Sequence, residues 1–137
     1  MKALTLILFA GLLLHGNALA QSKNPEEIIA DIVTILKSDN PEKVTSMYLT
    51  DLNLDKESTE NFNGQFRYVH DNYGNCEGFE IVEKTKHSES VMSYTCVFKY
   101  KLPLIFKFIF YRYEGKWKIT YFFFSDKVAK NLGVDQD

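Results

Sequence analysis

The 137-residue sequence contains few of the residues that metal centres and redox sites use. It has only two cysteines, which form no C-x-x-C motif and have no nearby histidines, and this argues against thioredoxin-like chemistry and a zinc site. The sequence has no G-x-S-x-G elbow, glycine-rich phosphate loop, H-E-x-x-H motif or calcium-loop pattern. A formal net charge of −2 argues against nucleic acid, which basic domains bind. We therefore predict no metal, no cofactor and no nucleic-acid partner.

The first 20 residues are typical of a cleavable secretory signal peptide. Lys2 gives a positive start, residues 4–14 are an apolar run without charge, and Ala18-Leu19-Ala20 places small residues where signal peptidase needs them. The apolar run is shorter than the about 20 residues of a membrane-spanning helix. We expect an exported bacterial protein, periplasmic or secreted, that starts at Gln21, forms one domain over 21–137 and has no integral membrane segment.

Helical signals fill the first half of the remaining chain. Asn24-Pro25 and Asn40-Pro41 are typical helix starts, because asparagine caps a helix and proline suits its first turn. A third helix is predicted from Ser58 or Thr59, although Asn63-Gly64 within it is a pair that often makes a turn. Apolar residues spaced four, three and four apart give this helix one apolar face. They are Phe62, Phe66, Val69 and Tyr73.

Alternating patterns in the second half predict four antiparallel strands. Glu114-Gly115 is typical of a two-residue hairpin turn, which pairs Tyr113 with Lys116. The same register puts Arg112 opposite Trp117. The four expected strands are residues 79–85, 92–100, 104–113 and 117–124.

The last hairpin has two different faces in this register. Continued without a break, the register places Phe108 opposite Tyr121 and Phe106 opposite Phe123, on an aromatic face that should pack against the helices. The other face mixes apolar side chains with lysines such as Lys107. That face is too apolar for solvent and too charged for a core, so we expect part of it to be buried in a homodimer.

Two segments resemble the NTF2-like (cystatin-like α+β) superfamily. They are Phe62, Phe66 and Tyr73-Gly74 before the first strand, and Tyr113-Glu114-Gly115-Lys116-Trp117-Lys118-Ile119 at the last hairpin. The chain is most similar to the small secreted bacterial domains of unknown function in that group, over residues 24–125, which is the expected ordered core. The resemblance implies an α+β fold, with three N-terminal helices packed on a curved four-stranded antiparallel sheet that encloses a conical pocket. Members include isomerases, dehydratases, transport factors and non-catalytic binders, so the fold alone does not give the function.

Aromatic residues are the main candidates for lining such a pocket. Tyr94, Trp117, Tyr121 and Arg112 are candidates for its mouth, and Arg112 over Trp117 would form a cation–π contact. The alternative is that these aromatic residues only fill the core and its rim. The full set of candidate ligand-binding residues is Phe66, Tyr73, Tyr94, Arg112, Trp117 and Tyr121.

Three residues near the end of the third predicted helix are candidates for acid–base chemistry. Enzymes of the family that the chain resembles use an Asp, His or Tyr inside the cone, and His70, Asp71 and Tyr73 are such residues. Helical spacing turns Tyr73 inward, leaves His70 at the edge of the apolar face and turns Asp71 toward water. We predict no catalytic residue with this pattern, and a histidine at the rim or surface is the competing interpretation of His70.

Cys76 and Cys96 favour a structural disulfide, since an exported protein meets an oxidising environment. Two separate buried thiols are the alternative. The register of the first two strands decides between them. If their turn centres on residue 86 the two cysteines lie opposite each other, and if it centres on Ser88 then Cys76 faces Tyr100.

These observations predict a non-catalytic exported domain that binds a small apolar or amphipathic ligand, or a protein partner, at an aromatic-lined pocket. The alternative is a small isomerase- or dehydratase-like enzyme, which would need a buried acid or base within reach of an empty cavity. A third hypothesis is an inhibitor or immunity-type protein that uses a basic strand surface. Six basic residues contribute to that surface: Lys99, Lys101, Lys107, Arg112, Lys116 and Lys118.

Overall fold

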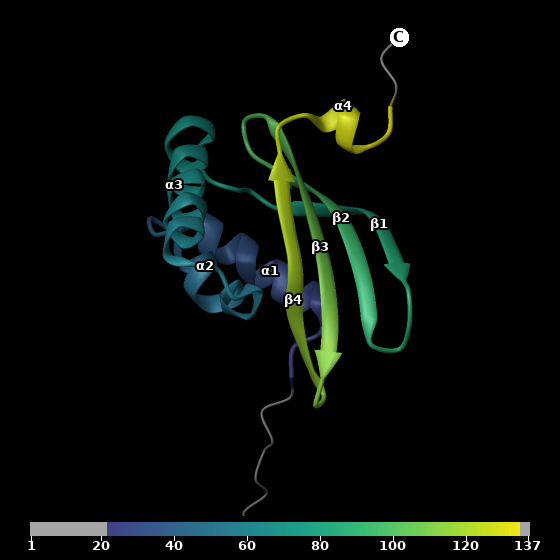
Figure 1. Cartoon of the computed structure of the whole chain (residues 1–137). Coiled ribbons are helices and arrows are strands. Elements are labelled where there is room, and N and C mark those ends of the chain that lie inside the picture. The colour runs from purple at the N-terminus through teal and green to yellow at the C-terminus, as the bar shows by residue number, and fades with distance from the viewer. Residues whose placement is uncertain (1–21, 135–137) are drawn as a thin grey trace, which may run out of the picture.

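The computed structural model describes residues 22–134, so the expected signal peptide at 1–20 lies outside the described residues. The described chain has an α+β fold with one four-stranded antiparallel sheet, and its main helices cover one face of that sheet (Figure 1). The predicted fold class and antiparallel sheet are therefore confirmed. None of the helices between residues 22 and 134 is both long and apolar enough to span a bilayer.

Helix α1 (Pro25–Leu36) begins where the sequence indicates. The side chain of Asn24 accepts a hydrogen bond from the Glu27 N–H, and the Glu27 carboxylate accepts one from the Asn24 N–H, both at 2.9 Å. This reciprocal capping box satisfies two backbone donors that a helix start leaves free. The face turned toward the sheet is fully apolar and consists of Ile28, Ile29, Ile32, Val33 and Leu36.

Helix α2 (Lys43–Tyr48) and the 3-10 helix η1 (Thr50–Leu52) form a compact turn after α1. Helix α3 (Lys56–Tyr73) then begins two residues before the predicted start, because Asp55 is its cap and accepts a hydrogen bond from the Ser58 N–H at 2.7 Å. It runs without a break through Asn63-Gly64 and ends at Gly74, whose φ of 82° suits glycine.

The sheet has the strand order β1-β2-β3-β4, with each strand antiparallel to the next (Figure 1). Glu114 and Gly115, with φ values of 48° and 75°, form the predicted turn of the last hairpin. The short helix α4 (Val128–Asn131) follows β4 and contacts β3. The strands are β1 (Phe79–Lys86), β2 (Val91–Lys99), β3 (Pro103–Tyr113) and β4 (Lys116–Ser125).

Phenylalanine side chains fill the space between the sheet and the helices. Phe98 and Phe106, on neighbouring strands, are stacked with ring centroids 3.8 Å apart. Phe108 and Phe110 continue the same row along β3, and both are fully buried. The helix-facing side of the sheet is thus a closed aromatic core over most of its area.

A bulge in β4 overturns the predicted register of the last hairpin. The predicted pairs near the turn are correct as far as Phe110 opposite Ile119, but the next residue, Thr120, has no partner in β3. Its hydroxyl donates instead to the Ile109 carbonyl oxygen at 3.2 Å. The extra residue reverses the inward and outward positions that follow it. Phe122 and Phe124 therefore face the helices, opposite Phe108 and Phe106, where Tyr121 and Phe123 were predicted.

The predicted Cys76–Cys96 disulfide is also wrong, because both cysteines are buried free thiols. Cys96 pairs with Ile81, five residues along the chain from Cys76. The Glu77 N–H bonds to the Lys99 carbonyl, which brings Cys76 beside the far end of β2. Neither of the two turn positions considered from the sequence occurs, because β1 and β2 extend further toward their turn and β1 carries a bulge between Ile81 and Glu83.

Candidate ligand-binding site

A hollow of about 360 Å³ lies between α3 and the end of the sheet where β3 begins and β4 ends. Residues from α3, from β3 and from the end of β4 line it, and we call it the α3–β4 hollow. It lies where the aromatic core reaches the surface, so one side of it is packed protein and the other side is open.

The α3 wall of this hollow is formed by side chains that share one face of the helix. Gln65, Val69 and Tyr73 succeed each other at intervals of four residues, and Gly64 and Tyr68 form a parallel row. Val69 is buried, whereas Tyr68 is 59% exposed. The rings of Tyr68 and Tyr73 meet edge to face with centroids 6.3 Å apart. This wall therefore presents aromatic surface to a molecule in the hollow.

Gly64 lies on the exposed helix side of the hollow. A glycine inside a helix costs about 1 kcal/mol relative to alanine, so its presence calls for a local reason. No neighbouring chain approaches it closely, because an added Cβ would find no atom within 4 Å. Its backbone is helical and needs no special φ. What glycine provides at this position is therefore empty space next to Tyr68 and Val69.

The sheet wall is rigid and apolar. Leu104, at the start of β3, is buried. The ring of Phe124 is stacked against Phe66, with centroids 5.5 Å apart, and against Phe106, with centroids 5.1 Å apart, both at an interplanar angle of 15°. Two parallel neighbours fix this ring in position. The hollow therefore has a preformed aromatic surface on the sheet side as well as on the helix side.

The hollow also has polar groups, which include the hydroxyl groups of Tyr68 and Tyr73. Gln65, Ser125 and Asp126 line the hollow, and Gln65 and Asp126 are exposed to solvent. A hollow with apolar walls and a few polar groups at its mouth is the usual form of a small-molecule site.

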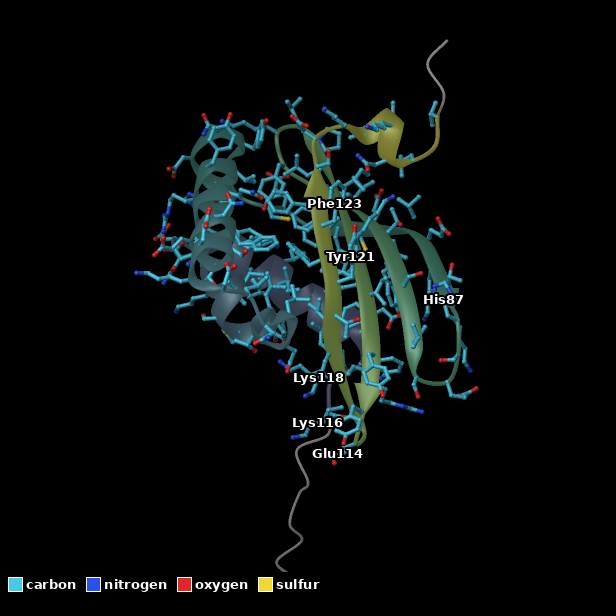
Figure 2. All side chains as sticks on the ribbon, viewed as in Figure 1. His87, Glu114, Lys116, Lys118, Tyr121 and Phe123 are labelled. Carbon is cyan, nitrogen blue, oxygen red and sulfur yellow. The ribbon has the colours of Figure 1, made fainter. Side chains whose placement is uncertain are left out.

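The structure separates the predicted ligand-binding residues. Tyr73 lines the α3–β4 hollow, and Phe66 lies behind its sheet wall in the core. Tyr94 is fully buried against Phe110, edge to face with centroids 5.6 Å apart, so it presents no surface to a ligand. Tyr121 is 46% exposed and lies on the face of the sheet turned away from the helices (Figure 2).

Arg112 and Trp117 form the predicted cation–π contact, with the guanidinium carbon 5.4 Å from the ring centroid. They are paired next to the hairpin turn, at the other end of the sheet from the α3–β4 hollow. Trp117 lines a separate hollow of about 370 Å³ beside α2. These two residues therefore do not belong to the site that contains Tyr73.

The acid–base candidates do not converge on the α3–β4 hollow. His70 Nδ1 lies 3.3 Å from a carboxylate oxygen of its neighbour Asp71, and neither residue lines the hollow. Tyr73 does line it, and the acid at its rim, Asp126, is exposed. Between residues 22 and 134, no three His, Cys, Asp or Glu side chains come together as metal ligands.

Of the nine residues that line the hollow, sequence reasoning predicted only Tyr73 as a ligand-binding residue and missed the other eight, which include Gly64, Tyr68, Leu104 and Phe124. Gly64 was placed within the third predicted helix but was considered only as part of a pair that often makes a turn, although its position four residues before Tyr68 on a helical pattern was a usable signal. Phe124 was missed because the bulge at Thr120 turns it inward. Comparison of the chain with protein-family models and with curated proteins gives no match.

Proposed function

We propose that the protein binds a small apolar or amphipathic ligand in the α3–β4 hollow and acts without catalysis. The observation that carries the proposal is the aromatic lining of the hollow, whose helix wall includes Gly64, an exposed helix-interior glycine at which an added Cβ would meet no atom within 4 Å. A protein without a ligand there would gain stability from alanine or leucine at this position. An empty position of this kind is explained by a molecule that occupies it.

The lining suggests the chemical class of the ligand. The aromatic surfaces of Tyr68, Tyr73 and Phe124 suit a flat ring or a short hydrocarbon chain. Asp126 at the rim favours a neutral or cationic head group over an anionic one. We therefore expect neutral or cationic amphiphiles of one or two rings to bind, and fatty-acid anions to bind less well.

A fluorescence titration with the neutral dye N-phenyl-1-naphthylamine tests this proposal. Gly64→Leu should fill the hollow from the helix side and weaken dye binding at least about 10-fold. Gly64→Ala is the matched control, because it makes the same change in helix propensity but adds a single methyl group. It should keep the affinity of the wild type. Equal dye binding by the leucine and alanine variants would contradict the proposal.

Export and the NTF2-like architecture are parts of the same proposal. Export is supported by the charge, apolar run and small residues of 1–20. The NTF2-like assignment is supported by helices that precede a four-stranded antiparallel sheet and cover one face of it. Expression of the full chain in a bacterium, followed by mass measurement of the periplasmic protein, tests export. We expect a product that starts at Gln21, and an uncleaved product in the cell pellet would contradict this.

The enzyme alternative has less support from the geometry. It needed a buried acid or base within reach of a cavity, and His70 and Asp71 lie outside the hollow. We therefore do not assign the protein an isomerase or dehydratase reaction.

The outer face of the sheet supports a second candidate function, the formation of a homodimer. Four aromatic side chains are exposed on it, an unusual amount for a surface that stays in water. Charges at the edges of this face are partly paired within the chain, since Glu80 on β1 pairs with Lys99 at 2.7 Å and Lys118 on β4 pairs with Asp51 at 3.4 Å. A twofold axis could therefore bury the exposed aromatic side chains of two copies against each other without bringing unpaired like charges together. The exposed aromatic residues are Tyr111, Tyr113, Tyr121 and Phe123.

Sedimentation equilibrium measures this association directly. We expect a dimer for the wild type and a monomer for Tyr121→Glu, which puts a charge among the exposed aromatic side chains of this face. A wild-type monomer at high concentration would exclude the homodimer. Binding of another protein to this face, lost when Lys107 and Lys118 are reversed in charge, would favour the inhibitor or immunity hypothesis.

A further inference from the structure

The hollow of about 370 Å³ that Trp117 lines lies between α2 and the edge strand β4. Side chains from α1, α2, η1 and β4 surround it, and we call it the α2–β4 hollow. It shares no lining residue with the α3–β4 hollow and lies at the opposite end of the sheet, where β4 begins. Its volume is within the range of small-molecule sites. The two hollows are therefore separate candidate sites.

Apolar side chains form the inner part of this hollow. Ile28 on α1 and Ile119 on β4 belong to the buried core, and Trp117 is partly buried beside them. Met47 on α2 is 58% exposed, although it is a large apolar residue. Thioether and indole groups both make favourable contacts with aromatic rings. The hollow therefore suits a ligand that contains an aromatic ring.

The ring of Trp117 is held from the neighbouring strand. Arg112 is its partner on β3, and paired side chains of antiparallel strands lie on the same face of the sheet. The guanidinium carbon of Arg112 is 5.4 Å from the centroid of the ring, within the range of a cation–π contact. The aromatic wall of the hollow is therefore formed before a ligand binds.

Positive charge exceeds negative charge around the hollow. Lys118 lies 3.4 Å from Asp51, and Lys23 pairs with Asp31. Lys116, on β4 next to the hairpin turn (Figure 2), forms no ion pair with a carboxylate between residues 22 and 134. One lysine charge is therefore left without an opposite charge beside it. The charged residues that line the hollow are Lys23, Asp51, Lys116 and Lys118.

Two hydroxyl groups at the hollow are bonded within the protein. The Tyr48 hydroxyl donates to a carboxylate oxygen of Asp31 at 2.5 Å, and the Ser22 hydroxyl donates to the Gly115 carbonyl oxygen at 2.8 Å. Lys116 is therefore the lining side chain best able to bind a polar group of a ligand.

We infer that the α2–β4 hollow binds a small aromatic carboxylate. The ring of the ligand contacts Trp117 and Met47, and its carboxylate pairs with the ammonium group of Lys116. A single negative charge matches the one lysine charge that the protein leaves uncompensated. The α3–β4 hollow has an acid at its rim and is proposed to favour neutral or cationic ligands, so this inference does not rest on the proposed function.

Trp117 provides a direct readout, because it is the only tryptophan in the sequence. Its emission is followed while the protein is titrated with phenylacetate and, separately, with phenylacetamide, which has nearly the same shape but no charge. We expect a saturable change in Trp117 emission with phenylacetate. Phenylacetamide should bind about 5-fold more weakly, because a partly exposed ion pair contributes that much.

Three variants separate the charge from the apolar contact. Lys116→Gln should weaken the binding of phenylacetate about 5-fold and leave that of phenylacetamide unchanged. Lys101→Gln is the matched control, because Lys101 is an exposed lysine between β2 and β3 at the other end of the sheet, and it should bind both compounds like the wild type. Met47→Ala removes an exposed apolar side chain and should weaken both compounds to the same degree.

Three results would overturn the inference. The first is the absence of a saturable change in Trp117 emission with phenylacetate. The second is equal affinity for phenylacetate and phenylacetamide. The third is the same affinity for phenylacetate in Lys116→Gln and Lys101→Gln, which would mean that the carboxylate does not pair with Lys116.

Discussion

Both faces of the sheet carry aromatic residues, which are buried on one face and exposed on the other. On the helix-facing side Phe98, Phe106 and Phe108 are completely buried, and on the outer side Tyr121 and Phe123 are 46% and 36% exposed. The same two strands, β3 and β4, contribute to both faces. What separates the faces is the layer of helices α1 to α3, which covers one of them, whereas the other is covered only beside the start of β3, where the short helix α4 lies and Ile105 is buried (Figure 1). The α3–β4 hollow lies where this cover ends, so it is apolar like the core and accessible like the surface.

Deletions of single residues, which change which side chains face the helices, should have the largest effects. Removing Lys107 from the central strand β3 exchanges inward and outward positions on one side of the deletion, and we expect the protein not to fold. Removing Thr120 takes out the bulge residue and leaves Phe122 and Phe124 facing inward, so we expect a loss of about 1 kcal/mol or less. Circular dichroism and urea unfolding of both variants measure the difference. An unfolded Thr120 deletion would show that the bulge is not where the extra residue is accommodated.

Truncation of one aromatic side chain on each face gives the next largest contrast. Phe106→Ala leaves a cavity between Phe98 and Phe124 and should lower the free energy of unfolding by about 3–5 kcal/mol. Phe123→Ala removes a partly exposed ring and should cost below about 1 kcal/mol in the monomer. Equilibrium unfolding in urea measures both. A cost for Phe123→Ala close to that of Phe106→Ala would mean that the outer face is covered in solution.

Thiol reactivity distinguishes the two faces chemically. Burial raises the pKa of the Cys96 thiol to about 12 and also raises that of Cys76, so neither forms the reactive thiolate near neutral pH. We expect both native thiols to react with iodoacetamide only after unfolding. A Thr95→Cys variant, with its thiol on the outer face, should react far faster. Mass spectrometry before and after denaturation measures this, and a mass lower by two hydrogens would instead reveal a disulfide.

The protein should become slightly less stable in acid, because one ion pair between its helices is lost. Arg67 and a backbone hydrogen bond lower the pKa of Glu42 below its usual 4.5 despite the opposing effect of burial, so this carboxylate stabilises the fold above pH 4.5. That contribution disappears as the pH falls through 4.5 toward the lower pKa of the folded state. Glu42→Gln should therefore be less stable than the wild type near neutral pH. The difference in free energy of unfolding should be below about 1 kcal/mol, because the Glu42–Arg67 pair is partly exposed. It should vanish in acid.

Urea unfolding over a range of pH gives these differences. Glu60→Gln is the control, because the Glu60–Lys56 pair is long, at 3.8 Å, and exposed. It should show no such pH dependence, and a Glu42→Gln difference that persists in acid would exclude the ion pair as its cause.

Local signals in the sequence were sufficient for much of the fold. The capping box at Asn24 and Glu27, the turn at Glu114-Gly115 and the alternation of the strands each depend on neighbouring residues, and the structure has all three. The start of α3 was predicted too late, at Ser58 or Thr59, because the capping side chain is that of Asp55.

Long-range register was not predictable in the same way. Residues 121–124 are aromatic at both inward and outward positions, so their pattern fits either register and gives no sign of the bulge at Thr120. The same limit led to the incorrect disulfide, since the pairing of Cys96 with Ile81 depends on how far β1 and β2 extend before they turn. The error in register also made the predicted site incomplete, because Phe124 lines the hollow only in the observed register.

The most direct test of the proposed function is to locate a bound ligand by intermolecular NOEs. With N-phenyl-1-naphthylamine at saturation, the proposal predicts contacts from the dye protons to the methyl groups of Val69 and Leu104, which lie on the two walls of the α3–β4 hollow. These contacts should be absent in Gly64→Leu and present in Gly64→Ala. Dye contacts to Tyr121 on the outer face, with none to Val69 or Leu104, would contradict the proposal.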